Sequence, residues 1–127
     1  MRVLLSLAVV AAAMSTMADA SDVRLSALPD SLHGTWGTSR QACGGSDGSK
    51  IVISGNTYSR ADAKCEIFWV TVTAAPKGAN YSARARCVEQ STGKAYPPSN
   101  LMFRPGDSDH ISVGTVMGSL TLYQRCP

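Results

Sequence analysis

Four cysteines constrain the fold of this chain more than any other feature of its sequence: Cys43, Cys65, Cys87 and Cys126. Their spacing is wide and contains no C-x-x-C pair, which argues against a zinc site or a redox motif. An even number of cysteines is typical of a disulfide framework in a chain that is exported to an oxidising compartment. The sequence therefore predicts two disulfides, provided that the chain is exported.

The N-terminus has the pattern of a secretory signal peptide. An apolar run, residues 3–14, follows Arg2, and small residues stand at Ala18 and Ala20 as in an A-x-A cleavage site. The run is too short and too rich in alanine for a membrane-spanning helix, which needs about 20 strongly apolar residues. We therefore expect a signal peptide over residues 1–20 and one domain over 21–127, in the periplasm or secreted, with no membrane span.

The charge of the chain is mildly positive, with 12 Lys and Arg residues against 9 Asp and Glu residues. The basic residues are scattered singly, so no stripe of them could follow a phosphate backbone. We therefore expect no nucleic acid as a partner.

Short apolar and β-branched runs alternate with clusters of turn residues along the chain, which indicates an all-β fold. The predicted strands are residues 34–39, 50–54, 57–61, 65–74, 81–89, 100–104, 110–114 and 119–126. Only residues 26–32 are expected to form a helical turn. Short connections between the runs favour antiparallel neighbours, so the sequence predicts a small up-and-down meander of about eight strands.

The hairpin of residues 65–74 and 81–89 has a register that its cysteines define. Facing residues of an antiparallel pair keep a constant sum of their numbers, so placing Cys65 opposite Cys87 fixes every other pair. One face then pairs Ile67 with Ala85, Trp69 with Ala83 and Thr71 with Tyr81, and the other pairs Glu66 with Arg86, Phe68 with Arg84 and Val70 with Ser82. The first face is suited to a core and the second to an ion pair and a cation-π contact. This register predicts a Cys65–Cys87 disulfide.

The remaining cysteines, Cys43 and Cys126, lie near the two ends of the meander. A disulfide requires Cα atoms within about 7 Å, so a bond between them would bring the ends together and close a barrel. The competing pairing of Cys43 with Cys65 fits an open sandwich, and mapping the disulfides would distinguish the two.

A G-x-W motif on the first strand and an arginine on the last resemble the lipocalin and wider calycin pattern: Gly34, Trp36 and Arg125. In that pattern the tryptophan packs at the closed end of the barrel under the arginine. The resemblance implies a lipocalin-like barrel, and it raises the alternative of a calycin-type binding protein for a small apolar ligand. A ligand cavity would be lined by Ile51, Ile53, Ile67 and Trp69, which are more simply read as a core.

Candidate catalytic residues are few. His33 and His110 are the only histidines, and Asp107 and Asp109 beside His110 form either a weak oxygen-rich metal site or an ordinary turn, which we favour. The glycine-rich segment 43–50 lacks the G-K-[ST] end of a phosphate-binding loop. We therefore expect a protein that is not an enzyme, with no catalytic residues, metal or cofactor.

The stretch from Ser54 to Tyr58 reads S-G-N-T-Y and has two interpretations. Gly55 and Asn56 are standard central residues of a type I′ or II′ hairpin turn. The same residues match an S-G-x-x-Y motif, which resembles that of the periplasmic and membrane-bound inhibitors of c-type lysozyme. In that family this loop enters the lysozyme cleft and its serine contacts the catalytic carboxylates.

The inhibitor resemblance implies a partner-binding set of Ser54, Gly55, Asn56 and Tyr58, with Lys64 or Lys77 as a second donor. The overall layout also resembles small exported proteins of alphaproteobacteria. Our first hypothesis is an exported inhibitor of a peptidoglycan hydrolase, a c-type lysozyme, that acts by inserting a loop into the active-site cleft. The alternatives are the calycin-type carrier and a non-catalytic structural protein of the cell envelope.

Overall fold

The computed structural model describes residues 23–45, 49–76 and 78–127. The predicted signal peptide, residues 1–20, and the predicted contact residue Lys77 lie outside the described residues.

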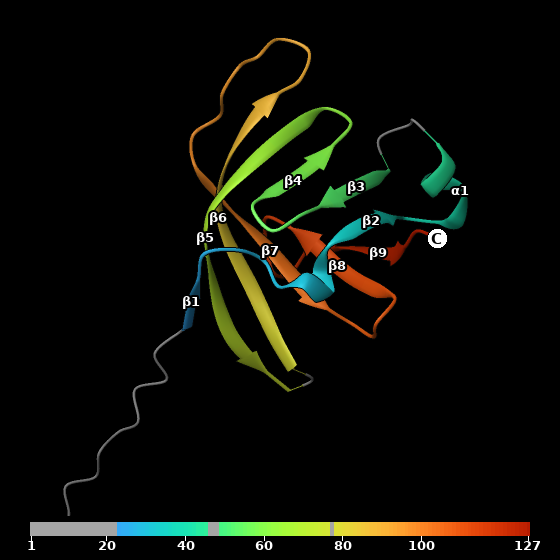
Figure 1. Cartoon of the computed structure of the whole chain (residues 1–127), viewed down its shortest axis with the longest axis vertical. Helices are drawn as coiled ribbons and strands as arrows, with labels where there is room; N and C mark the ends of the chain where they lie inside the picture. The colour runs from blue at the N-terminus through green and yellow to red at the C-terminus, as the bar shows by residue number, and fades with distance from the viewer. Residues whose placement is uncertain (1–22, 46–48, 77) are drawn as a thin grey trace, which may run out of the picture.

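The described part of the chain is mostly β-structure (Figure 1). Its strands are β1 (Val23–Leu25), β2 (Gly34–Gly37), β3 (Lys50–Ile53), β4 (Thr57–Arg60), β5 (Ala63–Ala75), β6 (Gly78–Glu89), β7 (Ser99–Pro105), β8 (His110–Gly114) and β9 (Thr121–Arg125). The two helices are the 3-10 helix η1 (Asp30–Leu32) and α1 (Arg40–Gly44). Every predicted strand corresponds to one of β2 to β9, and the predicted helical turn is η1.

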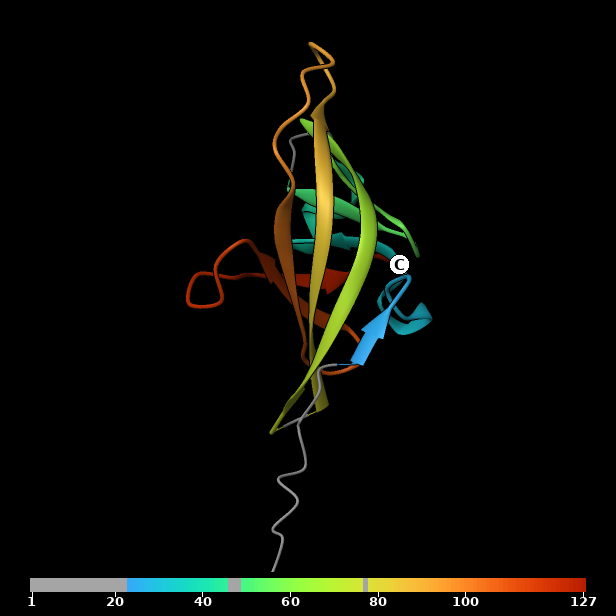
Figure 2. The same cartoon turned by 90° about the vertical axis from the view of Figure 1, so that its left-hand side faces the viewer.

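Strands β2 to β9 form a closed antiparallel barrel. Each strand pairs with the next one along the chain, and β9 pairs with β2 through Arg125 opposite Trp36. In the view of Figure 2, β5 and β6 cross the whole side of the molecule that faces the reader. The predicted eight-stranded closed meander is confirmed.

The first strand, β1, lies outside the barrel and was not predicted. It pairs with the second half of β5, where Val23 faces Val72 and Leu25 faces Val70. The partner of β5 on that side, β4, has only 4 residues and pairs with the first half alone. The rest of that edge of β5 would stay unpaired, and β1 supplies backbone partners for residues 70–72 of it.

The two predicted disulfides are both present, and they close the fold. Cys65 is bonded to Cys87 across β5 and β6, and Cys43 in α1 is bonded to Cys126 after β9 with their Cα atoms 5.5 Å apart. The alternative pairing of Cys43 with Cys65 is therefore wrong, and so is the open sandwich that it implied.

The predicted strand over residues 34–39 is too long. It ends at Gly37, and the Ser39 hydroxyl accepts a hydrogen bond from the Ala42 amide at 3.1 Å, so Ser39 caps the start of α1. A serine before a short helix is the standard N-cap signal, which could have been read from the sequence.

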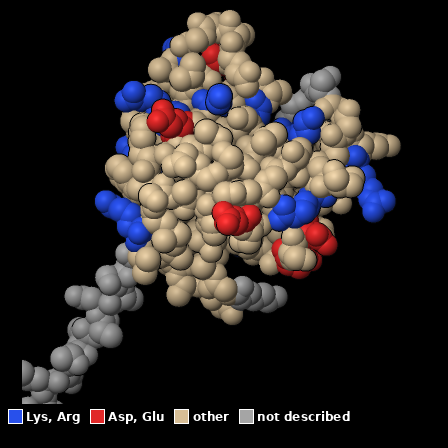
Figure 3. Space-filling view, viewed as in Figure 1, with Lys and Arg blue, Asp and Glu red and all other residues tan. Residues whose placement is uncertain are grey.

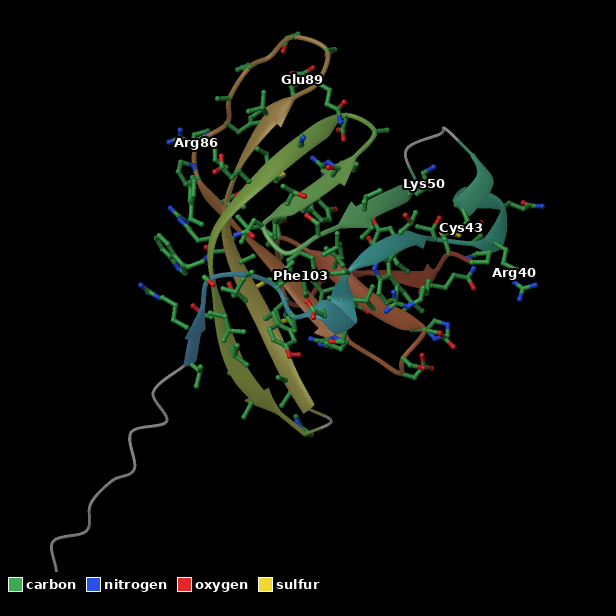
Figure 4. The ribbon with its side chains drawn as sticks, in the orientation of Figure 1. Arg40, Cys43, Lys50, Arg86, Glu89 and Phe103 are labelled. Carbon is green, nitrogen blue, oxygen red and sulfur yellow. A yellow bond between two sulfur atoms is a disulfide. The ribbon has the colours of Figure 1, made fainter. Side chains whose placement is uncertain are left out.

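The core fills the barrel. Large side chains from opposite walls meet there: the Tyr58 and Phe103 rings pack edge to face with centroids 5.9 Å apart, and Phe103 points inward in Figure 4. The other buried apolar residues of the cluster include Leu28, Leu32, Trp36, Ile51, Ile53, Ile67, Val70, Leu101, Ile111 and Val113.

The predicted register of β5 and β6 is right at its cysteine end and wrong beyond Ile67. Cys65 faces Cys87, Glu66 faces Arg86 and Ile67 faces Ala85, as predicted. A bulge then shifts the pairing by one residue. The observed pairs are Trp69 with Arg84, Val70 with Ala83, Thr71 with Ser82 and Val72 with Tyr81, which replace the predicted Phe68–Arg84, Trp69–Ala83, Val70–Ser82 and Thr71–Tyr81 pairs.

The bulge has a physical reason in the size of the barrel. The interior of an eight-stranded barrel is just wide enough for its own side chains, and the large side chains of Trp36, Tyr58 and Phe103 are already buried in it. The extra residue in a bulge changes which side chains point inward. Val70 therefore enters the core in the place predicted for Trp69, and Trp69 lies on the outer surface.

Candidate functional site

The turn between β3 and β4 joins Ser54 to Thr57 through a hydrogen bond from the Ser54 amide to the Thr57 carbonyl at 2.9 Å. Neither Gly55 nor Asn56 has a positive φ. The predicted type I′ or II′ turn is therefore wrong, because both types need a positive φ at a central residue. The hairpin connection itself is where it was predicted.

Neighbouring segments explain the unexpected turn conformation. The Leu28 amide donates to the Gly55 carbonyl at 2.9 Å, and the Ile67 amide donates to the Asn56 carbonyl at 2.7 Å. The Asn56 side-chain amide donates to the Ser26 carbonyl at 3.2 Å. These bonds hold the turn from both sides. The Gly55 and Asn56 carbonyls must point toward the amides of Leu28 and Ile67, so the turn conformation depends on segments outside the hairpin.

The turn presents a pair of hydroxyl groups. Ser54 Oγ and Thr57 Oγ1 form a hydrogen bond with each other, and the Ser54 side chain is exposed. Two hydroxyls that share one hydrogen bond use only one of their two hydrogens. The second hydrogen remains available to an acceptor on a partner. Either hydroxyl can be the donor within the pair, so the pair as a whole can still donate one hydrogen bond outward.

Tyr58 does not belong to this surface. Its side chain is 4% exposed and lies in the core against Phe103. Burial, with a smaller contribution from nearby Tyr123, raises the pKa of Tyr58 to about 12. The expectation that Tyr58 contacts a partner is therefore wrong. Along β4 the Tyr58 side chain points into the core, and its packing anchors the strand that follows the turn.

A groove of about 600 Å³ lies on the outer face of the barrel beside the turn. Asn56 and Thr57 line one side, Lys64, Glu66 and Arg86 line the surface of β5 and β6, and Glu89 lines the far side. Figure 4 shows Arg86 pointing away from the barrel and Glu89 at the start of the loop that follows β6. The fold thus brings the predicted residues Asn56 and Lys64 to one groove, with Ser54 next to it through Thr57.

The loop after β6 forms the far wall of this groove and is tied to Glu89. The Tyr96 hydroxyl and the Ser91 hydroxyl donate to the two Glu89 carboxylate oxygens at 3.1 and 2.9 Å. The hydrogen bond to Glu89 raises the pKa of Tyr96. The Gly93 amide also donates to the Glu89 carbonyl at 2.9 Å. The carboxylate therefore organises the wall, while Lys64 and Arg86 offer cations to a ligand in the groove.

The aspartates beside His110 form a turn. Asp107 Oδ1 lies 2.7 Å from His110 Nδ1 and accepts from the Asp109 amide at 2.9 Å. These two contacts, the histidine first, lower the pKa of Asp107. The other histidine, His33, has its Nε2 2.9 Å from the Leu28 carbonyl. Over the described residues, no group of three or more His, Cys, Asp or Glu side chains could hold a metal ion.

The residues predicted to line a ligand cavity are not arranged around one. Ile51, Ile53 and Ile67 are packed together in the core cluster, and Trp69 lies on the outside. In the described ranges, no helix is long and apolar enough to cross a membrane.

Some residues of the groove were not predicted as site residues: Thr57, Glu66, Arg86 and Glu89. The hairpin register did place Glu66 and Arg86 on the outer face. The far wall depends on the Tyr96–Glu89 contact within a loop, for which the sequence has no local signal.

No protein-family model, curated protein or solved structure matches this chain.

Proposed function

We propose that this protein is a non-catalytic binding protein that inhibits a peptidoglycan hydrolase of the c-type lysozyme class through the turn from Ser54 to Thr57 and the adjoining groove. One observation carries the proposal: an exposed hydroxyl pair stands on a turn that backbone hydrogen bonds to Leu28 and Ile67 hold in place. The S-G-x-x-Y resemblance of this turn gives the target class.

The chemistry of such a target fits the donors of this surface. Glycoside hydrolases act with a pair of carboxyl groups that flank the scissile bond. The free hydrogen of the Ser54–Thr57 pair can be donated to one carboxylate, and the Lys64 ammonium can approach a second acidic group from the groove. The turn is already held in one conformation, so little conformational freedom would be lost on binding.

The motif tyrosine would have a different role from a contact residue. Tyr58 anchors β4 in the core, so the partner would contact the turn and groove residues alone. The net charge of +3 also opposes approach to a basic lysozyme. Added salt should therefore speed association, since it screens repulsion between like charges.

The test is a lysis assay with the mature chain and a c-type lysozyme. We expect inhibition at micromolar protein. The double substitution Ser54→Ala/Thr57→Val should weaken inhibition about tenfold or more, because it removes a hydrogen bond to a charged group. Ser108→Ala is the matched control because Ser108 lies in the turn before β8 and does not line the groove. The absence of inhibition, or equal losses in both variants, would reject the proposal.

A further inference from the structure

A second surface, on the outer face of β5, carries two adjacent exposed aromatic rings. Phe68 is 40% exposed and Trp69 is 38% exposed, with ring centroids 6.5 Å apart. In a regular strand these consecutive residues would point to opposite faces. The bulge after Ile67 turns both of them outward.

Arginines from the neighbouring strands accompany both rings. The guanidinium of Arg24 in β1 lies 4.9 Å from the Trp69 centroid, and that of Arg86 in β6 lies 5.9 Å from the Phe68 centroid. Arg84 is the register partner of Trp69. Figure 3 shows basic side chains along the left edge of the molecule, the side that faces the reader in Figure 2. We call Arg24, Phe68, Trp69, Arg84 and Arg86 the aromatic-arginine patch.

The patch has a net positive charge. Its arginines are Arg24, Arg84 and Arg86, and the carboxylate that faces Arg86 across the strand pair is Glu66. A second copy of the chain seated on this surface would bring like charges together, which disfavours self-association through it. Charge complementarity therefore favours an anionic partner.

The chemistry of the patch matches the headgroup region of a lipid bilayer. Tryptophan and other amphipathic rings prefer the boundary between hydrocarbon and water. A guanidinium stacked on a ring keeps its N-H edge free to bind phosphate oxygens in bidentate fashion. Neither ring lines the groove beside the Ser54 turn. Both rings are exposed on the outer face of β5, where a flat surface could contact them. We propose that the aromatic-arginine patch docks this barrel peripherally on an anionic bilayer.

Trp69 makes the proposal directly measurable. The chain has 2 tryptophans, and the other, Trp36, is 1% exposed in the core. A change in tryptophan emission on binding therefore reports on Trp69. With the mature chain and vesicles of phosphatidylglycerol and phosphatidylcholine, we expect sedimentation with the vesicles, a blue shift, and quenching by brominated acyl chains. Pure phosphatidylcholine vesicles should give none of these.

Variants separate docking by the patch from attraction by net charge. Arg24→Gln/Arg84→Gln should weaken vesicle binding roughly thirtyfold, since an arginine near an anionic surface contributes roughly fivefold. Arg40→Gln/Arg104→Gln makes the same charge change on α1 and β7, where both arginines are exposed, and should change binding less than about threefold. Trp69→Ala should weaken binding and abolish the emission response, with near-ultraviolet circular dichroism to verify the fold.

Several outcomes would overturn the proposal. No sedimentation with anionic vesicles would do so, as would equal losses in the two arginine pairs or binding without a Trp69 response. A Trp69 response to polyglutamate but not to vesicles would indicate an acidic protein partner instead. The test does not depend on hydrolase inhibition: Arg86 is the one patch residue that also lines the groove beside the Ser54 turn, and none of the variants changes Arg86.

Discussion

The guanidinium carbon of Arg125 lies 4.2 Å from the centroid of the Trp36 ring. The same guanidinium donates hydrogen bonds to the carbonyls of His33 and Ser31, both at 2.8 Å, and the Trp36 indole donates to the Leu32 carbonyl at 3.0 Å. These contacts join β9 to η1 and to β2. They confirm the predicted contact of the Trp36 ring with the Arg125 guanidinium.

Removal of the Arg125 side chain should destabilise the barrel. Arg125→Ala leaves the His33 and Ser31 carbonyls without these donors and uncovers Trp36, and we expect a loss of about 2–3 kcal/mol in the free energy of unfolding. Urea denaturation measures it. Arg104→Ala, at an exposed position in β7, should cost less than about 0.5 kcal/mol. Equal losses would mean that Arg125 does not help to close the barrel.

A side chain at Gly34 should destabilise the fold. Its φ is +132°, and a Cβ there would lie 3.0 Å from Arg125 Nη1. Gly34→Ala should cost about 1–3 kcal/mol of unfolding free energy from the backbone alone. The matched control is Gly44→Ala at the end of α1, where a Cβ meets no atom within 4 Å, and its effect should be neutral or mildly stabilising. A stable Gly34→Ala protein beside an unstable control would contradict this account of the motif glycine.

The Cys43–Cys126 disulfide should stabilise the fold more than the Cys65–Cys87 disulfide does. It spans a sequence separation of 83 residues, against 22 for Cys65–Cys87. In the chain-entropy model, loops of these lengths correspond to about 4.5 and about 3.5 kcal/mol. Cys43→Ser/Cys126→Ser should therefore lower the free energy of unfolding by about 4.5 kcal/mol. Mass mapping of the native protein should give these two pairs, and a Cys43–Cys65 peptide would contradict the closed barrel.

Alkaline pH should destabilise the protein through Tyr58. Its pKa is raised from 10.0 to about 12 by burial, so the unfolded chain loses the phenol proton first as pH rises. The stabilising contribution is complete below pH 10 and is lost between about 10 and 12. The free energy of unfolding should fall by up to about 2 kcal/mol over that window. Tyr58→Phe should show a shallower decline, and identical pH profiles would show that Tyr58 ionisation is not responsible.

The fold was predictable where neighbouring residues alone decide it. The cysteine register gave the pairs from Cys65 to Ile67 correctly, because both faces of the hairpin agree there. The shift at Trp69 depends on how much interior volume Trp36, Tyr58 and Phe103 leave, and those residues come from other strands. A pattern within one hairpin carries no information about that volume.

The site was predictable in part for the same reason. Asn56 and Lys64 could be chosen from the turn and its flank, and both line the groove. The burial of Tyr58 was predictable, because side chains alternate along a strand and its neighbour Ser59 faces outward; the motif instead suggested a contact role for the phenol. The turn conformation was not predictable, because the amides of Leu28 and Ile67, distant in sequence, determine where the turn carbonyls point.

The central proposal is that the turn from Ser54 to Thr57 binds a c-type lysozyme. The most direct measurement is titration of the isotope-labelled mature chain with an unlabelled lysozyme, followed by amide chemical shifts. We expect the largest changes at Ser54, Asn56, Thr57 and Lys64, with Phe68 and Trp69 unaffected. No shift changes, or changes confined to the aromatic-arginine patch, would contradict the claim.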